Sequence, residues 1–542
     1  MVKLKNIFCG VGMLAICSVV AKLLGAFFRI PLTNILGAQG MGIYQMVFPI
    51  YSVVLTISCG GIPVAISKLV ASKSAEKDVN GVKSVLKVGL LAVTIVGLSF
   101  SVALVLLHNL IAHLQGNSQA SLAYLGIAPS ILCVCIVSVF RGYFQGKLNM
   151  LPSSVMQIVE QFAKLSFGIG LSLKFLEYGV EYAVLGAVIG ISISEAVAMS
   201  VMLLFYCLEI LKTKFRMSKK FSRLALQAEI ALDWNISDYD VLKAQNGDSK
   251  STLRQIYKVA IPVTLGALIF PLTQVVDSVV VINYLTSVGY SKDIATAQFG
   301  ILNGPVSSLI NLPVLITLAI SIALLPKVAK AYAMGEGCTQ VTIDAMRYSL
   351  LIAIPTSIGL LLFAKDIMYF MYGRGLDEME LNQGAKILQL TSTIVFYASI
   401  MQVCTATMQG MDDAFKPAAI LGIVALIKVL ATLIFIYFWG IYGVALAGVV
   451  FYMLACMLNI IICKSKIDFK KTSITAFKIL VSASIAFGLS WIVRYFCFGQ
   501  RASFVALMLC GLGAASLYTL LLLALGCLKH NMVDAKSLPI QQ

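Results

Sequence analysis

Apolar residues are arranged along the chain in runs of about 20, separated by short polar breaks. A helix of about 20 apolar residues is long enough to cross the hydrocarbon core of a membrane. The pattern therefore predicts an all-α integral membrane protein with fourteen transmembrane helices. The expected segments are approximately 7–28, 41–66, 84–107, 121–140, 152–173, 183–206, 257–284, 299–325, 344–364, 385–409, 417–438, 441–463, 473–498 and 502–528.

The composition agrees with this pattern, because 59% of the 542 residues are hydrophobic and only 12% are charged. The formal charge of +17 does not indicate a nucleic-acid partner, since the basic residues are spread over short loops between apolar runs. With the N-terminus inside, 30 of the 41 basic residues fall in cytoplasmic loops and tails, and seven fall in external loops. The positive-inside rule then predicts that both termini are cytoplasmic.

The longest polar break covers residues 208–256, which begin with several basic residues and continue with an acidic part. It is too short for an enzyme domain, and we interpret it as a cytoplasmic linker loop whose basic arm lies near the membrane surface. The expected organisation is an N-terminal lobe, this linker, a C-terminal lobe, two extra helices and a cytoplasmic tail. These parts correspond to residues 1–207, 208–256, 257–463, 464–528 and 529–542.

The two expected lobes repeat each other. The glycine of Gln145-Gly146 precedes Lys164 by 18 residues, and the glycine of Gln409-Gly410 precedes Lys428 by the same number. Matching positions in the two halves are offset by 249 to 264 residues. Six helices per repeat is an even number, so both copies enter the membrane from the same side. A parallel repeat of this kind predicts a substrate site between the lobes.

The four basic residues that remain lie at membrane depth, and they are Lys22, Lys164, Lys386 and Lys428. Three of these, Lys22, Lys164 and Lys428, are candidates for an anion site, together with Arg29 at the external end of the first segment. Lys22 and Arg29 are close to two helical turns apart, so both project from one face of the first segment. A cation inside a membrane helix usually faces a protein interior or a watery cavity. The alternative for Arg29 is that it marks the interface and extends to the lipid headgroups.

Lys164 and Lys428 are the repeated pair. Glu160 stands one helical turn before Lys164, so these two can form an ion pair, which is a structural alternative to substrate binding. The position that matches Glu160 in the second half is Val424. We therefore expect Lys428 to contribute more to anion binding, and Lys164 to contribute more to stability.

Polar side chains also form stripes on the seventh and eighth segments. One stripe contains Asp277, with Gln274 and Ser278 as neighbours, and the other contains Asn303 and Asn311, with Ser307 between them. Such stripes either line a cavity or only join helices. Asp277 and Glu160 are the candidates for binding a coupling Na⁺ or H⁺, and the alternative for Asp277 is an ion pair with a cavity lysine.

Pro262, Gly266 and Pro271 interrupt the seventh segment. They predict either a hinge for movement of the lobes or a fixed bend that shapes the cavity. The thirteen cysteines and three histidines show no disulfide or metal spacing, and no cofactor is expected. The basic N-terminus followed by an apolar run is interpreted as an uncleaved first helix.

The order of several short motifs resembles that of a known family. The motifs are Lys22-x-x-Gly25 followed by Arg29, the Asn34-x-x-Gly37 turn, Tyr44-Gln45, Gly61-Ile62-Pro63 and the Gln145-Gly146 to Lys164 pattern. Across essentially the whole chain, the sequence resembles the stage V sporulation protein B group of polysaccharide exporters, relatives of the lipid II flippases in the multidrug/oligosaccharidyl-lipid/polysaccharide (MOP) exporter superfamily. This resemblance implies a bacterial plasma membrane. The resemblance implies alternating access and an undecaprenyl-pyrophosphate-linked saccharide as substrate, for the cell wall or spore cortex. In the lipid II flippases, basic residues on the first helix lie in the cavity, and Lys22 and Arg29 occupy the matching positions.

Three classes of function compete. A flippase for a lipid-linked saccharide is favoured because buried cations outnumber buried acids. A cation-coupled multidrug antiporter would need a more acidic cavity, and a membrane-embedded transferase would need a catalytic carboxylate or histidine set. A phosphate-binding Gly-Lys-Ser/Thr loop is absent, so ATP hydrolysis and enzymatic activity are not expected. The expected partners are the lipid-linked substrate and membrane lipids, and we expect a monomer.

Overall fold

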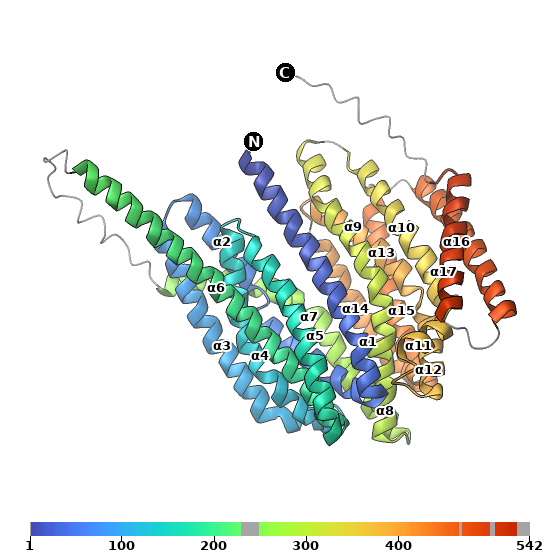
Figure 1. Ribbon diagram of the computed structural model, residues 1–542. Coiled ribbons are helices and arrows are strands. Elements are labelled where there is room, and N and C mark those ends of the chain that lie inside the picture. The colour runs from blue at the N-terminus through green and yellow to red at the C-terminus, as the bar shows by residue number, and fades with distance from the viewer. Residues whose placement is uncertain are drawn as a thin grey trace. The chain divides into compact units, whose positions relative to one another are not determined.

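The structure is a computed structural model that describes residues 2–228, 249–335, 337–413, 415–464, 469–498 and 504–527. Every element in these ranges is a helix, so the predicted all-α fold is confirmed (Figure 1). The contacts divide the chain into two compact units, residues 1–28 with 43–279 (unit 1) and residues 29–42 with 280–542 (unit 2). The α-helices are α1 Val2–Cys59, α2 Ile62–Ala75, α3 Val79–Leu114, α4 Ser121–Gly146, α5 Leu151–Phe175, α6 Val180–Ala228, α7 Ser249–Ser287, α8 Lys292–Ile301, α9 Ser307–Ala333, α10 Thr339–Leu362, α11 Ala364–Tyr372, α12 Glu378–Thr391, α13 Ile394–Gly410, α14 Phe415–Trp439, α15 Ile441–Cys463, α16 Phe469–Phe498 and α17 Phe504–Ala524.

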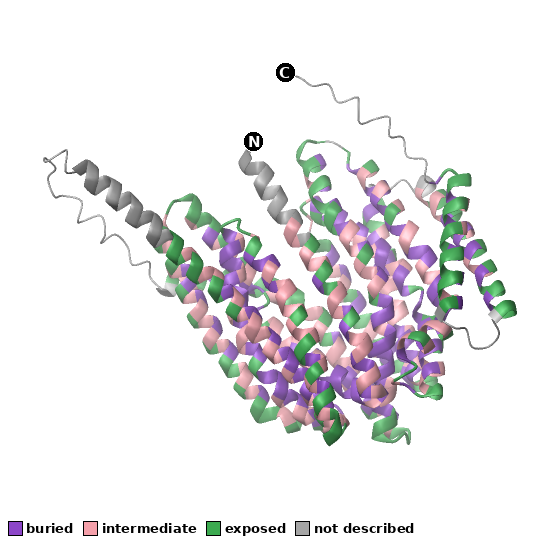
Figure 2. Cartoon of the chain, viewed as in Figure 1, coloured by how far each residue is buried: buried purple, intermediate pink, exposed green. Residues whose placement is uncertain are grey.

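Helix α4 is the central helix of unit 1, in contact with α2, α3 and α6. It is the most buried of the apolar spans, whereas α3 leaves a broad face exposed (Figure 2). Two glycines let α4 approach α2 closely. A Cβ on Gly142 would lie 2.7 Å from the carbonyl oxygen of Pro63, and a Cβ on Gly146 would lie 2.7 Å from that of Ser67. Gly146 belongs to the Gln145-Gly146 motif, so helix packing accounts for that glycine.

Helix α1 is two helices joined at Gly37, whose φ of 67° and ψ of −175° are not helical. Only glycine adopts this backbone conformation without a steric penalty. The turn predicted at Asn34-x-x-Gly37 is therefore confirmed, and it separates the first two predicted segments.

The core of unit 2 is formed by buried side chains of α9, α10, α13 and α15, together with α16 and α17. Tyr518 of α17 donates a hydrogen bond of 3.0 Å to the carbonyl oxygen of Leu351 in α10. Arg494 of α16 forms an ion pair with Asp366 of α11, and only 9% of its side chain is exposed. The two helices predicted to lie outside the repeat are therefore integral to the packing of this unit.

Turns at matching places in the two halves share an unusual backbone conformation. Residues with positive φ pair as Gly37 with Gly289, Lys77 with Gly335, Leu148 with Asp412, and Gly179 with Gly440. The offsets between partners are 252, 258, 264 and 261 residues. These offsets fall within the range predicted from the sequence motifs, which supports the internal repeat.

The count of fourteen transmembrane helices is not confirmed. Among the described residues, 11 helices are long and apolar enough to cross a membrane, or 12 if the bent pair α12 and α13 forms one span. This count treats residues 16–75 as one helix, although Gly37 breaks it. The count also leaves out α5, which carries the charged residues Glu160 and Lys164 in its interior.

The stretch 208–256, expected to be a loop, is helical at both ends. Helix α6 continues to Ala228 and α7 begins at Ser249, while residues 229–248 lie outside the described part of the chain. Leucine, lysine and arginine make up ten of the 21 residues in 208–228, and these residues have high helix propensity, so the helix continues past its apolar part. Units 1 and 2 are defined by contacts, whereas the predicted domains are defined by the sequence repeat. The two divisions answer different questions, so the predicted domain boundaries stay a prediction.

Candidate functional site

In unit 1, the first part of α1 lies along α5. At one end of the contact between α1 and α5, Ser18 donates a hydrogen bond of 2.8 Å to Oε1 of Gln157. A Cβ on Gly25 would lie 3.1 Å from Oε1 of Gln161, so the glycine of the Lys22-x-x-Gly25 motif provides space for α5. This contact places α1 against the face of α5 that carries the charged residues.

Four charged side chains from three helices gather beside this contact, and we call them the unit 1 charge cluster. Its members are Arg141 of α4, Glu160 and Lys164 of α5, and Glu195 of α6. Glu195 interacts electrostatically with the other three, and Glu160 interacts with both Lys164 and Arg141. The Nζ atom of Lys164 also lies over the ring of Phe28, 5.4 Å from its centre.

The surroundings of the cluster are polar on the side of α1. The hydroxyl oxygen of Tyr51 lies 2.8 Å from Oγ of Ser130 and interacts electrostatically with Glu195 and Glu160. Cys59 of α1 and Cys133 of α4 also interact electrostatically with Glu195. Tyr51 and Ser130 are buried, so polar groups of the protein interior border the cluster on this side.

Two acids and two bases at this depth balance each other in charge. Isolated ions in a membrane interior are strongly disfavoured, and each member of the cluster reduces the cost of the opposite ones. All four residues are partly buried, so none of them is fully enclosed by the packing of the helices. The Nε atom of Arg141 is buried and, within the described residues, has no hydrogen-bond partner.

The predicted residues of the first helix have different surroundings. Lys22 is exposed on the part of α1 that belongs to unit 1. Arg29 belongs to unit 2, is partly buried, and interacts electrostatically with Tyr372 of α11. The hydroxyl of Tyr372 lies 3.5 Å from the carbonyl oxygen of Pro305. Pro305 is part of the π-helix η4, Leu302–Val306, which also contains the candidate Asn303.

A π-helical turn often marks a functional position, because it removes the regular hydrogen bonds of the helix. In unit 2, Asn303 uses its Nδ2 to donate a hydrogen bond of 3.2 Å to the carbonyl oxygen of Phe299. Asn34 of α1 donates one of 2.8 Å to the carbonyl oxygen of Met371, next to Tyr372. Arg29 thus interacts with Tyr372 directly, whereas Asn303 lies two residues before Pro305, whose carbonyl oxygen Tyr372 approaches.

The structure places the remaining predicted residues on three helices. Asn311 is exposed on α9, and Lys428 is partly buried on α14. Asp277 is partly buried on α7, next to Ser278, whose Oγ accepts a hydrogen bond of 2.9 Å from Gln115. Helix α7 is continuous through Pro262, Gly266 and Pro271, so the predicted hinge stays a prediction.

Sequence reasoning missed Glu195 and Arg141. Glu195 lies in the middle of the predicted segment 183–206, and an acid at that depth was a signal in itself. Arg141 directly follows the predicted segment 121–140 and was counted with the cytoplasmic loops. Their proximity to Glu160 and Lys164 depends on the packing of three helices, which no spacing in the sequence reveals.

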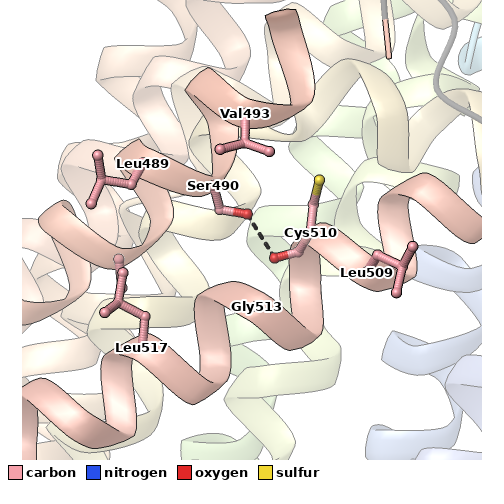
Figure 3. Close-up of a pocket in the computed structure, with 8 residues that line it drawn as sticks. Leu489, Ser490, Val493, Leu509, Cys510, Gly513 and Leu517 are labelled. Carbon is pink, nitrogen blue, oxygen red and sulfur yellow. Dashed lines mark hydrogen bonds between the residues drawn. The ribbon is translucent and has the colours of Figure 1, made fainter. Parts of the chain in front are cut away.

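Two cavities in unit 2 are apolar and do not provide an anion site. One of about 340 Å³ lies between α16 and α17, where Leu489, Val493, Leu509 and Leu517 surround the hydrogen bond of 2.6 Å from Ser490 to the carbonyl oxygen of Cys510 (Figure 3). The other, of about 490 Å³, lies between α10, α16 and the bend from α12 to α13. Neither cavity is lined by a charged residue.

Solved structures with a similar fold are membrane transporters. The lipid II flippase MurJ in an inward closed conformation aligns with a TM-score of 0.69 and 16% sequence identity, covering 95% of this chain and 98% of that chain. An inward-facing multidrug resistance MATE family transporter of the MOP superfamily aligns with a TM-score of 0.65 and 15% identity, covering 86% of this chain and 98% of that chain. Together with the apolar spans, this fold places the protein in the class of multi-pass membrane proteins with a transporter fold.

The sequence defines the family within that class. Residues 7–332, more than half of the chain, match the family described as polysaccharide biosynthesis protein, and the chain belongs to this family. Stage V sporulation protein B of Bacillus subtilis (strain 168) is 31% identical over 373 residues, covering 67% of this chain and 66% of that protein. Lipid II flippase MurJ of the same organism is 24% identical over 494 residues, covering 88% of this chain and 85% of that protein. The predicted resemblance is confirmed.

Proposed function

We propose that this protein is a flippase that moves an undecaprenyl-pyrophosphate-linked saccharide across the bacterial plasma membrane by alternating access. The substrate is a lipid II-like precursor of peptidoglycan or spore cortex. The names of the relatives, a lipid II flippase and a stage V sporulation protein, support this function. The protein acts as a monomer with both termini in the cytoplasm, and its function is transport rather than catalysis.

The observation that carries the proposal is the presence of cations at membrane depth in the transporter fold. Lys164 and Arg141 lie together in unit 1, and Arg29 lies beside Tyr372 in unit 2. A pyrophosphate needs fixed cations and hydrogen-bond donors in a place of low dielectric constant. The chain offers both in helices that are otherwise apolar.

The alternative is a cation-coupled multidrug antiporter, which the similarity to MATE structures favours at the level of the fold. A site for cationic drugs needs an excess of acids. The unit 1 charge cluster instead contains as many bases as acids. A coupling Na⁺ or H⁺ remains part of the proposal, with Glu160 and Asp277 as the candidate residues.

Two measurements test the proposal. Native mass spectrometry of the purified protein should reveal a co-purifying polyprenyl diphosphate saccharide. Proteoliposomes that contain fluorescent lipid II should then expose the labelled headgroup to a membrane-impermeant quencher faster than liposomes without the protein. A quenching rate equal to that of empty liposomes, with the protein folded and inserted, would contradict the flippase function.

A further inference from the structure

The two acids of the unit 1 charge cluster have no role in binding an anionic lipid, and their presence beside the two cations requires an explanation. Glu160 interacts with Lys164 and Arg141, and so does Glu195. One of these pairs, Glu160 with Lys164, lies one turn apart on α5, whereas the other three join different helices among α4, α5 and α6, so helix packing brings them together. The glutamates thus occupy the positive field that a diphosphate would use.

An anion with two or more negative charges changes this balance. If it joined Lys164 and Arg141 while both glutamates stayed ionised, the cluster would hold at least four negative charges against two positive ones. Like charges in a medium of low dielectric constant repel strongly. Binding of the anion is therefore favoured when the glutamates move away from the cations, when one of the two glutamates takes up a proton, or when both changes occur.

We propose that Glu160 and Glu195 are internal counter-ions that hold Lys164 and Arg141 until the diphosphate headgroup of the lipid displaces them, with uptake of a proton by the glutamate pair. This inference rests on the proposed function and names a device that controls its site. In the empty state, the glutamates keep the two cations from remaining as uncompensated charges inside the membrane. In the loaded state, the headgroup compensates the cations, and the proton reduces the repulsion between the headgroup and the acids.

The proton is assigned to the glutamates because of what faces them. Glu160 and Lys164 approach Glu195 from α5, Arg141 and Cys133 approach it from α4, and Tyr51 and Cys59 approach it from α1. The lysine and arginine are already protonated, and the tyrosine and the two thiols are neutral in their ordinary state. The two carboxylates are therefore the groups in this cluster that can accept a proton near neutral pH.

The test measures binding of radiolabelled undecaprenyl diphosphate to the full-length protein in nanodiscs, at about pH 6, 7 and 8. Because binding takes up a proton, the affinity of the wild-type protein should fall with rising pH, by up to about tenfold per pH unit. This change is added to the one that titration of the probe itself causes. Glu195→Gln and Glu160→Gln remove one negative charge and the proton acceptor. Each should bind about tenfold more tightly than the wild type at about pH 8, with a shallower pH dependence.

Matched variants separate the effect from general changes of charge or folding. Glu177→Gln removes an exposed acid of the 3₁₀ helix η2, Leu176–Tyr178, and should bind like the wild type. Lys164→Gln should lose most of the binding. Melting temperatures show which variants are folded, and either glutamate variant alone decides the question if the other does not fold.

The outcomes are distinguishable. If both glutamate variants bind as the wild type does, or more weakly, with an unchanged pH dependence, the counter-ion role is wrong and the flippase function stands. If the folded wild-type protein binds no undecaprenyl diphosphate at any pH, the proposed substrate is wrong, and the inference fails with it.

Discussion

Single charged residues in this protein have three different surroundings. Lys22 is exposed on α1, Arg29 lies beside Tyr372, and Lys164 belongs to a balanced cluster. Basic residues in apolar helices therefore have different surroundings. A charge with compensating partners is held by them until a ligand takes their place, whereas a charge at an exposed surface is available to a substrate or a headgroup directly.

Replacing Lys22 or Arg29 by alanine should reduce transport of the lipid while folding and membrane level stay unchanged. The reason is that charge rather than size matters for binding a diphosphate. Lys22→Arg should therefore be milder than Lys22→Ala. Flipping in proteoliposomes measures the effect, and a normal rate for the double alanine variant would show that both residues are only interface anchors.

Replacing Lys164 by methionine should destabilise the protein, because it removes one of the two cations that face Glu160 and Glu195. Loss of one partner from a partly buried group of charges costs about 2 kcal/mol. Adding Glu160→Gln should restore part of the melting temperature, since it removes one of the excess acids.

The control for this prediction is Lys174→Met, which changes an exposed lysine near the end of the same helix. It should leave the melting temperature almost unchanged. Equal losses for Lys164→Met and Lys174→Met would mean that the cluster contributes no stability of its own.

At the scale of helices, glycines decide how closely elements pack. In unit 2, the segment of α1 after the Gly37 turn crosses α8, and a Cβ on Gly42 would overlap the carbonyl oxygen of Thr296. A Cβ on Gly300 of α8 would overlap the carbonyl oxygen of Ala38. Each glycine thus permits the backbone of one helix to contact that of the other. By contrast, a Cβ on Gly170 or Gly266 would have nothing within 4 Å.

Gly42→Ala should lower the melting temperature, because backbone atoms at this crossing have to move apart. Such overpacking costs about 1 to 3 kcal/mol. Gly170→Ala, in the interior of α5, should instead leave stability unchanged or raise it by up to about 1 kcal/mol, because alanine restricts the unfolded chain and favours a helix. Thermal unfolding of both variants in detergent would reveal the difference, and a stable Gly42→Ala protein would show that the crossing can relax.

Gly266→Ala provides a test of the hinge in α7 that does not disturb packing. The added methyl group meets open space, so the protein should fold with unchanged or slightly higher stability. If α7 bends at this position during transport, the reduced flexibility should lower the flipping rate severalfold while lipid binding stays the same. An unchanged rate would favour a fixed bend or a straight helix.

At the scale of the whole molecule, the contacts and the repeat divide the chain differently. Helix α7 up to Val279 belongs to unit 1, although it begins the second repeat, and residues 29–42 belong to unit 2, although they lie in the first. Gln115 of unit 1 shows how α7 is held. Its Nε2 donates to Ser278 of α7 at 2.9 Å and to the carbonyl oxygen of Met46 at 3.0 Å. Tertiary contacts therefore join segments that the sequence repeat separates.

The predicted orientation of the whole chain rests on the distribution of basic residues and has a direct test. Single cysteines introduced into a cysteine-depleted protein should react with an impermeant reagent in intact cells at position 118, the exposed residue of the 115–119 segment, and stay unlabelled at position 220. The first is predicted to be external and the second cytoplasmic. External labelling at position 220 would reverse the orientation.

The sequence by itself determined the helical membrane fold, because long apolar runs have few alternatives in a bilayer. It also determined the repeat and the turn at Gly37, since both follow from local patterns of residues along the chain. Lys22, Arg29, Glu160 and Lys164 were identifiable for a similar reason. A charge within an apolar run is visible in the sequence wherever the helix finally packs.

Only the tertiary structure decided which charges meet. Glu195 and Arg141 approach Glu160 and Lys164 because α4, α5 and α6 pack around one point, and Arg29 approaches Tyr372 because two distant segments are in contact. It likewise joined α16 and α17 to the core of unit 2 and α7 to unit 1. The physical reason is that hydropathy specifies how far each helix extends in the membrane, whereas its neighbours are chosen by close packing and by pairing of polar groups on its faces.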